Sequence, residues 1–308
     1  MMLHVLLLTV GFVFLVKGAD WFVEGAAGIA KKLGIPQLVI GLTIVAMGTS
    51  MPEAAVSITS ALSGSAGISI GNVVGSNILN ILIILGITAV LTNVRIQKTT
   101  FRYEIPFMIG ITIILMAFGI TGNQITFLEG ILFWLLFLIF LGYLFVISKK
   151  GSAQDEEEIK ELPLWKGVLG IIIGGILVVK GSDFAVEGAT EIARYFGMSE
   201  RFIGLTIVAF GTSLPELVTS VTAARRGNAD IAIGNIVGSN IFNILFVIGT
   251  TALICNVPFD QKFVIDTIVA IFSGVLLWAG TIRYKELRKN CGIVMLLCYA
   301  GYFIYLCK

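Results

Sequence analysis

The stretch GLTIVAMGTSMPE at residues 41–53 returns almost unchanged as GLTIVAFGTSLPE at residues 204–216, an offset of 163 residues. The same offset carries ISIGNVVGSNILN at 68–80 onto IAIGNIVGSNIFN at 231–243, and no gap is needed between the two matches. Long matches at one offset indicate an internal duplication. Each half of the chain is therefore predicted to be one copy of a single structural unit.

The composition indicates a membrane protein. Apolar residues make up 57% of the chain and charged residues 13%, with a mean hydropathy of +0.98, whereas soluble domains have roughly a quarter of their residues charged. Apolar stretches of bilayer-spanning length recur from end to end, which leaves no room for a sizeable soluble domain. The opening stretch lacks the basic region and cleavage site of a signal peptide, so we expect it to stay as the first helix. The net charge of +2 gives no indication of nucleic-acid binding.

Each half contains about five apolar segments of the length that a bilayer requires. An odd number of spans forces the second copy to enter from the opposite side, the inverted-topology repeat of secondary transporters. The predicted fold is therefore an all-α polytopic membrane protein, with about ten transmembrane helices in two inverted five-helix repeats. The predicted spans lie near residues 2–30, 37–62, 67–91, 104–119, 125–148, 165–193, 200–224, 229–254, 260–282 and 290–307. The repeats occupy residues 1–148 and 165–308, and a polar linker occupies 149–164.

The distribution of Lys and Arg predicts the orientation. Of the 21 basic residues, 15 fall in loops after odd-numbered spans, and only four lie on the opposite face. By the positive-inside rule the first face, including the linker, is predicted to be cytoplasmic and both termini extracellular. The linker's run of acids lacks the glycine turn of a calcium-binding loop, so we interpret it as a solvated connection.

Glu53 and Glu216 are equivalent carboxylates near the middle of their predicted spans. A charge at that depth costs about 2.5–3.5 kcal/mol on insertion scales. Inversion about an axis in the membrane plane brings the two toward one another at the midplane, where they would repel unless cations or a proton occupied the gap. Ser50 and Ser213 precede them by three residues, so their hydroxyls share the carboxylate face if helicity resumes. We therefore predict a cation site.

Two prolines next to these glutamates supply a further kind of ligand. Pro52 and Pro215 cannot donate to the carbonyls four residues back, at Gly48 and Gly211. Unwound backbone at membrane depth is tolerated where it is buried or lines a cavity, and transporters place ion sites there. The freed carbonyls are therefore predicted to be available to an ion.

The following span of each half carries polar residues every four positions. Amide and hydroxyl oxygens, together with carboxylates and carbonyls, suit hard cations such as calcium or sodium rather than zinc or copper. The glycines of the same motifs are interpreted as small-xxx-small helix packing, which does not explain the glutamates. The polar positions are Asn72, Ser76 and Asn80 in the first copy and Asn235, Ser239 and Asn243 in the second.

A third repeated motif, KGADWFVEGA from Lys17 and KGSDFAVEGA from Lys180, carries four more acids. For these residues an interface-facing or packing role and a role in transport both stay open. The cysteines show no metal-ligand spacing and are interpreted as small hydrophobic residues, and the single histidine supports no metal or catalytic site. The acids are Asp20, Glu24, Asp183 and Glu187.

The motifs G-T-S-x-P-E and G-N-x-x-G-S-N, each present twice, resemble those of the calcium/cation antiporter superfamily, most closely its prokaryotic sodium/calcium exchangers. The G-N-x-x-E-H type repeat of proton/calcium exchangers is absent. The resemblance implies a central calcium site of Glu53, Glu216 and the carbonyls of Thr49 and Thr212. It implies flanking sodium sites that use both glutamates, the carbonyls of Ala46 and Ala209, and Ser50, Ser213, Ser76 and Ser239, with Asn80 and Asn243 lining the centre. Asn243 replaces an aspartate of potassium-dependent relatives, which favours potassium independence.

The predicted function is antiport of calcium against sodium by alternating access, in which the first and sixth spans slide against the others as the resemblance implies. A proton/calcium antiporter that uses the same glutamates is the alternative. A cation channel fits an inverted repeat with interrupted helices poorly, and an intramembrane hydrolase lacks a nucleophile, so we expect no enzymatic activity. We expect no cofactor, a monomer whose partners are the two ions and the lipid bilayer, and a place in a prokaryotic cell membrane.

Overall fold

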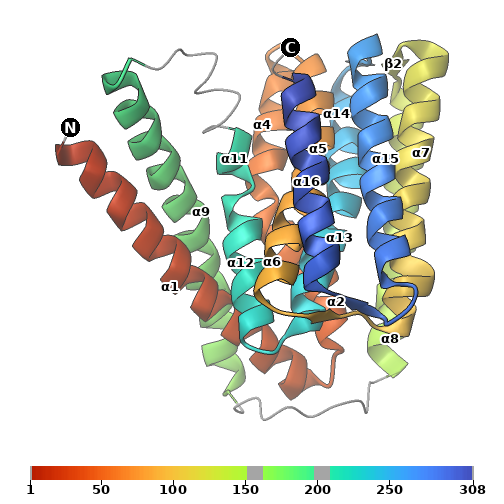
Figure 1. The fold of residues 1–308 in the computed structure, drawn as a ribbon. Helices are drawn as coiled ribbons and strands as arrows, with labels where there is room; N and C mark the ends of the chain where they lie inside the picture. The colour runs from red at the N-terminus through yellow and green to blue at the C-terminus, as the bar shows by residue number, and fades with distance from the viewer. Residues whose placement is uncertain (1, 151–161, 198–208, 307–308) are drawn as a thin grey trace.

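A computed structural model of the chain describes residues 2–150, 162–197 and 209–306, and it is helical almost throughout (Figure 1). The acidic run of the linker and the predicted start of the seventh span lie outside the described residues. The first half contains α1 (Met2–Leu33), α2 (Gln37–Ile40), η1 (Gly41–Val45), α3 (Ala46–Thr49), α4 (Met51–Leu62), α5 (Gly67–Leu79), η2 (Asn80–Leu85), α6 (Gly86–Leu91), η3 (Thr100–Glu104), α7 (Ile105–Gly122) and α8 (Phe127–Lys150). The second contains α9 (Leu164–Tyr195), α11 (Ala209–Thr212), α12 (Leu214–Arg225), α13 (Ala229–Phe242), η5 (Asn243–Ile248), α14 (Gly249–Ile254), α15 (Gln261–Thr281) and α16 (Lys289–Leu306).

These helices form spans that follow the sequence prediction. Within the described residues, eight helical runs are long and apolar enough to cross a bilayer, and the pair Gln37–Thr49 and Met51–Leu62, bent by 50°, makes a ninth. The helices α11 and α12 are the described part of the seventh predicted span. The η segments are π-helical and continue directly into α-helix, so α5, η2 and α6 make one span, as do α13, η5 and α14.

The two halves run in opposite directions. Figure 1 shows α1 descending from the N-terminus while α9, its counterpart, ascends beside it. Two short antiparallel ribbons join the halves: β1 (Val94–Arg95) pairs with β4 (Glu286–Leu287), and β2 (Gln124–Ile125) pairs with β3 (Val257–Pro258). Because β1 and β3 occupy equivalent positions in the repeat, the inversion that relates the two halves also relates the two ribbons. One ribbon lies at each end of the bundle.

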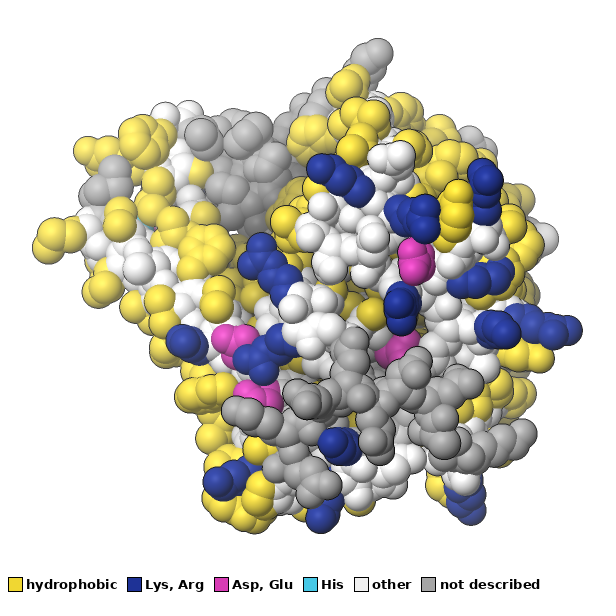
Figure 2. All heavy atoms as spheres, turned by 60° about the horizontal axis from the view of Figure 1, so that its bottom comes forward, with side chains coloured by type: hydrophobic (Ala, Val, Ile, Leu, Met, Phe, Trp, Pro, Cys, Tyr) yellow, Lys and Arg dark blue, Asp and Glu magenta, His cyan; other side chains and the backbone are white. Residues whose placement is uncertain are grey.

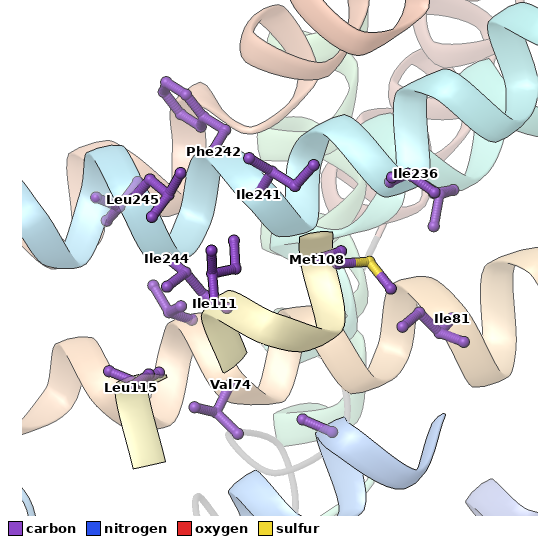
Figure 3. Close-up of a cluster of buried hydrophobic side chains, with 14 of the residues drawn as sticks. Val74, Ile81, Met108, Ile111, Leu115, Ile236, Ile241, Phe242, Ile244 and Leu245 are labelled. Carbon is purple, nitrogen blue, oxygen red and sulfur yellow. The ribbon is translucent and has the colours of Figure 1, made fainter. Parts of the chain in front are cut away.

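The third span of each half forms the centre of the molecule. In the most apolar window of Gly67–Leu91, 83% of residues are buried, and in that of Ala229–Ile254 94% are, against 11% for α16. Figure 3 shows α5, η2, α13 and η5 meeting α7 through side chains that include Ile81, Met108 and Ile241. The outer helices expose large apolar side chains such as Leu128 and Ile139, as a bilayer solvent requires.

Glycines spaced by seven join α1 to α9. A Cβ atom added at Gly18 would lie 2.8 Å from the carbonyl oxygen of Gly174, and one at Gly25 would lie 2.6 Å from that of Gly167. Gly11 meets Gly181 in the same way. Close backbone approach through small residues is how helices pack without a hydrophobic driving force. This glycine seam holds α1 and α9 together as one helical pair.

We expect Gly18→Ala and Gly174→Ala to lower the melting temperature of the detergent-purified protein, because each methyl group would meet backbone rather than a movable side chain. Overpacking of this kind typically destabilises by about 1–3 kcal/mol. Gly142→Ala in α8 is the matched control, since nothing lies within 4 Å of its added Cβ. Equal melting temperatures for all three variants would contradict a close-packed seam.

Candidate cation site at the centre of the bundle

Both GTS-x-PE motifs interrupt their helices at the serine. Ser50 has φ −86° and ψ 9°, and Ser213 has φ −92° and ψ 3°, so each leaves helical geometry just before a proline in the first turn of the next helix. The missing proline N–H prevents the ordinary helical hydrogen bond at that point. In the first half, α3 and α4 meet there at an angle of 50°. The interruption predicted from the prolines is present in both halves.

The interruption brings the two glutamates into one buried centre. Glu53 and Glu216 are each only 1% exposed, and each is contacted by the helix break of the other repeat. Ser50 Oγ donates to Glu216 Oε1 at 2.7 Å, and Ser213 Oγ donates to Glu53 Oε1 at 3.5 Å. Each glutamate therefore receives its serine from the other copy.

This cross-pairing differs from the sequence expectation, in which each serine shares a face with the glutamate of its own helix. The reason is the backbone turn at Ser50 and Ser213, since a near-zero ψ ends the helical register before the carboxylate is reached. The structure therefore couples the two repeats through their serines.

Four buried oxygen atoms on the two glutamates and on the two predicted lining asparagines accept no hydrogen bond. They are Glu53 Oε2, Glu216 Oε2, Asn80 Oδ1 and Asn243 Oδ1, two equivalent pairs under the inversion. A buried polar atom without a partner costs about 1–3 kcal/mol, and more when it carries charge. A cation that dehydrates completely accepts oxygen ligands of this kind. The arrangement is chemically suited to hold a hard cation.

The first residue of each polar stripe joins helices instead of lining the centre. Asn72 Nδ2 donates to the carbonyl of Glu53 at 3.1 Å and to Ser57 Oγ at 2.9 Å. Asn235 Nδ2 makes the equivalent bonds in the second half, and its Oδ1 accepts from Thr49 Oγ1 at 3.0 Å. These amides hold the helix after each break against the next span.

The remaining predicted ligands come from both repeats. Ser239 Oγ donates to the carbonyl of Ala46 at 3.3 Å, and Thr212 is the last residue of α11, directly before the break at Ser213. Ser76 is buried on α5, and Ala209 is the first residue of α11. A common ligand set formed by these positions stays a prediction.

The carbonyl freed by Pro215 already has a partner from outside the repeated pair of spans. Ser182 Oγ of α9 donates to the carbonyl of Gly211 at 2.5 Å. This bond links the α1–α9 pair to the interrupted helix next to Glu216.

Two buried asparagines at the centre were missed by the sequence analysis. Asn77 and Asn240 bond reciprocally across the inversion axis. Both follow the serine of the GSN motif, so their signal was present in the repeat. The polar positions were predicted from a spacing of four residues, and Asn77 and Asn240 do not fall on that spacing.

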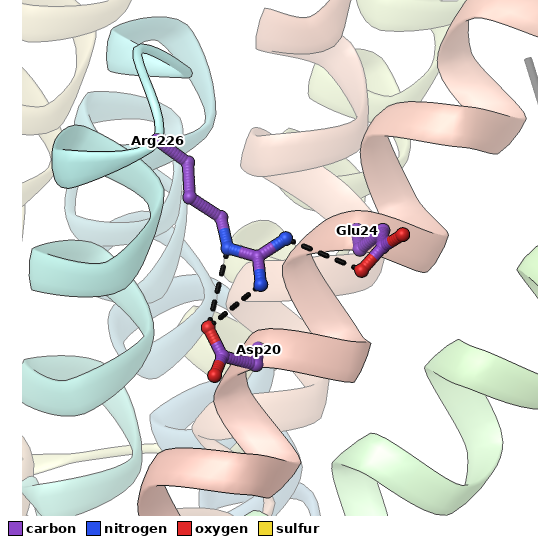
Figure 4. Close-up of polar contacts among 3 residues, drawn as sticks. All are labelled: Asp20, Glu24 and Arg226. Atoms are coloured by element: carbon purple, nitrogen blue, oxygen red, sulfur yellow. Dashed lines mark hydrogen bonds and ion pairs between the residues drawn. The ribbon is translucent and has the colours of Figure 1, made fainter. Parts of the chain in front are cut away.

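The acids of the third motif lie outside the centre. Arg226 reaches from the end of α12 to Asp20 and Glu24 of α1, as Figure 4 shows. Asp183 pairs with Lys180 on its own helix. Of the roles left open, a surface ion pair is the one that the structure shows for Asp20 and Glu24.

A cavity of about 970 Å³ leads toward the centre from the end of the bundle where β2 and β3 lie. It is lined by Asn72, Gly71 and Val56 and, at its other side, by Asp260 and Phe263. One of its lining residues, Asn72, donates to the backbone carbonyl of Glu53.

Comparison with known proteins agrees with this geometry. Residues 3–146 and 166–308 match the family described as sodium/calcium exchanger protein. The sodium/calcium exchanger MaX1 of Methanosarcina acetivorans is 32% identical, covering 98% of this chain and 97% of that one, and the inner membrane protein YrbG of Escherichia coli is 36% identical, covering 99% and 96%. A structure of the sodium-calcium exchanger NCX_Mj superposes with a TM-score of 0.86 at 32% identity, covering 99% of both chains. The predicted polytopic all-α fold with inverted repeats is confirmed.

We expect Glu53→Gln to raise the melting temperature of the cation-free protein by several degrees, because it removes one of two buried charges that repel each other. Calcium should stabilise the wild-type protein and have little effect on the variant. Glu187→Gln, an exposed carboxylate on α9, is the control with the same chemical change. A calcium-induced shift of unchanged size in Glu53→Gln would exclude this glutamate from the site.

Proposed function

Because the chain belongs to the sodium/calcium exchanger family and is a cation/calcium antiporter, we propose that it exchanges calcium for sodium at the central site. The family consists of transporters and not of enzymes. The observation that carries the proposal is the pair of buried glutamates, each with one carboxylate oxygen that accepts no hydrogen bond, together with the donor-free amide oxygens of Asn80 and Asn243. Two anions and neutral oxygens from both repeats make a set that calcium and sodium can each occupy.

We assign calcium to the middle of the site. Glu53 and Glu216 would supply charge, and the carbonyls of Thr49 and Thr212 would add neutral ligands beside the helix breaks. Thr49 sits immediately before the interruption, with its hydroxyl directed to Val45 and Asn235. This leaves its carbonyl, rather than its hydroxyl, for the ion.

Sodium would occupy flanking positions that share the same carboxylates. The proposed ligands are both glutamates, the carbonyls of Ala46 and Ala209, and the hydroxyls of Ser50, Ser213, Ser76 and Ser239. The contact between Ser239 and the Ala46 carbonyl supports one such position, since it already joins a hydroxyl and a carbonyl from the two repeats. Asn80 and Asn243 would line the space between.

Exchange follows from competition for one pair of carboxylates. Calcium and sodium cannot both hold Glu53 and Glu216, so binding of one releases the other. The empty site leaves two charges buried without a counter-ion, which disfavours reorientation of the unloaded protein. If more than two sodium ions replace each calcium ion, each net charge couples to about 2.3 kcal/mol per 100 mV of membrane potential.

Movement of α1 and α9 as a pair would open the site alternately to the two sides. The glycine seam supports joint movement because it fixes the two helices to one another. The bond from Ser182 to the Gly211 carbonyl gives this pair a direct contact with an interrupted helix at the site. Both glutamates come from one polypeptide, which supports a monomer as the transporting unit.

The face without termini is proposed to be cytoplasmic. Figure 2 shows Lys and Arg side chains gathered over this face, while both ends of the chain lie at the opposite end in Figure 1. Positive charge marks the cytoplasmic side of membrane proteins. The termini and the 970 Å³ cavity would then be extracellular, in a cell membrane.

The proposal is tested by calcium-45 uptake into proteoliposomes loaded with sodium, potassium or a proton gradient as the only driving force. We expect uptake to require internal sodium and to fall to background in Glu53→Gln and Glu216→Gln, because each loses half of the site's charge. Glu187→Gln should transport like the wild type. Uptake driven by protons alone would replace sodium by the proton as the coupling ion, and uptake indifferent to the glutamates would refute the site.

A further inference from the structure

Four buried asparagines meet where α5 with η2 crosses α13 with η5. None is more than 3% exposed, and they form two equivalent pairs: Asn77 with Asn240, and Asn80 with Asn243. Every bond among them crosses between the repeats. The site described above uses only Asn80 and Asn243, which leaves Asn77 and Asn240 without a stated role.

The bonds determine which way each amide points. Asn77 Nδ2 donates to the backbone carbonyl of Asn240 at 3.2 Å. A carbonyl only accepts, so the nitrogen of Asn77 must face it and Asn77 Oδ1 must face the other way. That oxygen accepts from Asn243 Nδ2 at 3.1 Å. The nitrogen of Asn243 is thereby used, and its Oδ1 is left at the site without a donor.

The second half repeats this chain of bonds. Asn240 Nδ2 donates to the carbonyl of Asn77 at 3.1 Å, and Asn240 Oδ1 accepts from Asn80 Nδ2 at 2.9 Å. Asn80 Oδ1 is then the donor-free atom. The backbone carbonyls therefore fix the orientation of Asn77 and Asn240. These two side chains in turn fix the orientation of Asn80 and Asn243.

We propose that Asn77 and Asn240 are positioning residues that turn the oxygens, and not the NH₂ groups, of Asn80 and Asn243 toward the transported cation. An amide free to rotate would present hydrogen-bond donors to the ion for part of the time, and a donor repels a cation. This inference rests on the proposed function, because it concerns the same site.

Helix adhesion alone is the competing explanation, since asparagines joining two spans stabilise packing whether or not an ion binds. The two explanations differ when the oriented residue is replaced by aspartate. A carboxylate has two acceptor oxygens and no donor, so it needs no partner to orient it. The aspartate would give up its bond to Asn77 or Asn240, but the bonds of those two residues to the backbone carbonyls of the other repeat would remain and would still hold the helices together.

The test is the dissociation constant for calcium, measured by calcium-45 binding to purified protein in detergent. We expect Asn77→Ala to weaken binding about tenfold in the wild-type background and less than twofold in an Asn243→Asp background. We expect the same result for Asn240→Ala, tested in the wild-type background and in an Asn80→Asp background. This second set of variants replaces the first if the first fails to fold. An equal loss in both backgrounds would refute the positioning role and leave adhesion. Absence of sodium-dependent uptake by the wild type would instead refute the proposed function.

A separate observation concerns the ion pairs of Figure 4. Arg226 donates to Asp20 at 2.8 and 3.2 Å and to Glu24 at 3.3 Å, joining the end of α12 to α1. In the repeat, Asp183 and Glu187 of α9 are equivalent to Asp20 and Glu24 of α1. The residue equivalent to Arg226 is Ser63, which carries no charge. Within the described part of the chain, Asp183 has its ion pair with Lys180 on the same helix.

We infer that Arg226 is a latch at the cytoplasmic end of α1, and that Ser63, at the equivalent position of the first repeat, cannot form the same ion pair. It would hold α1 against α12 while that end is closed, and it must break before the end can open. The asymmetry would favour the conformation with the cytoplasmic end closed. This inference rests on the proposed movement of α1 with α9 but not on which ions are coupled.

The repeat itself supplies the variants for the test. Arg226→Ser makes the two ends alike, and adding Ser63→Arg moves the latch to the opposite end. In proteoliposomes of known orientation, the KM for calcium at the Arg226 side should fall about threefold in Arg226→Ser and further in the double variant, while the KM at the opposite side rises. The effect should shrink in high salt because these groups are partly exposed. Unchanged values, or equal changes on both sides, would refute the latch.

Discussion

The structure depends on the burial of two like charges at the centre of an apolar bundle. Glu53 and Glu216 are each almost fully enclosed, and no Lys or Arg is within reach to neutralise them in the described part of the chain. Only mobile cations or protons can make this arrangement favourable. The carbonyls at the helix breaks, the hydroxyls of Ser50 and Ser213 and the asparagine oxygens are all neutral groups that could surround a cation. The positive charge itself has to come from solution.

The fold and the central glutamates could be predicted from the sequence because the two halves of the chain can be aligned with each other. The offset of 163 residues located both glutamates and both prolines, and the odd number of spans in each half predicted the inverted topology. Hydropathy located the spans to within a few residues, since a bilayer imposes a minimum length on each. These predictions needed no knowledge of side-chain contacts.

The contacts across the inversion axis could not be predicted in the same way. That Ser50 bonds to Glu216 rather than serving Glu53 depends on the backbone turn at the serine, which local spacing does not specify. Asn77 lay outside the helical stripe used for selection, although the repeat marks it as clearly as Asn80. The glycine seam was obscured because glycine is common in membrane helices for several reasons, and the role of Arg226 depended on a partner 206 residues away.

The ribbons that join the halves bear on how the protein is made. Val94 of β1 has its partner in Leu287 of β4, and these strands are separated by α7, α8, the linker and all of the second half except its last helix. During synthesis the first repeat therefore enters the membrane with an unpaired strand edge, half of the ligands and one uncompensated glutamate. Its final packing has to wait for the last helices to arrive. We therefore expect assembly of this protein to be completed late, and a chain truncated before β4 to present quality-control proteases with an unfinished surface rather than a smaller folded domain.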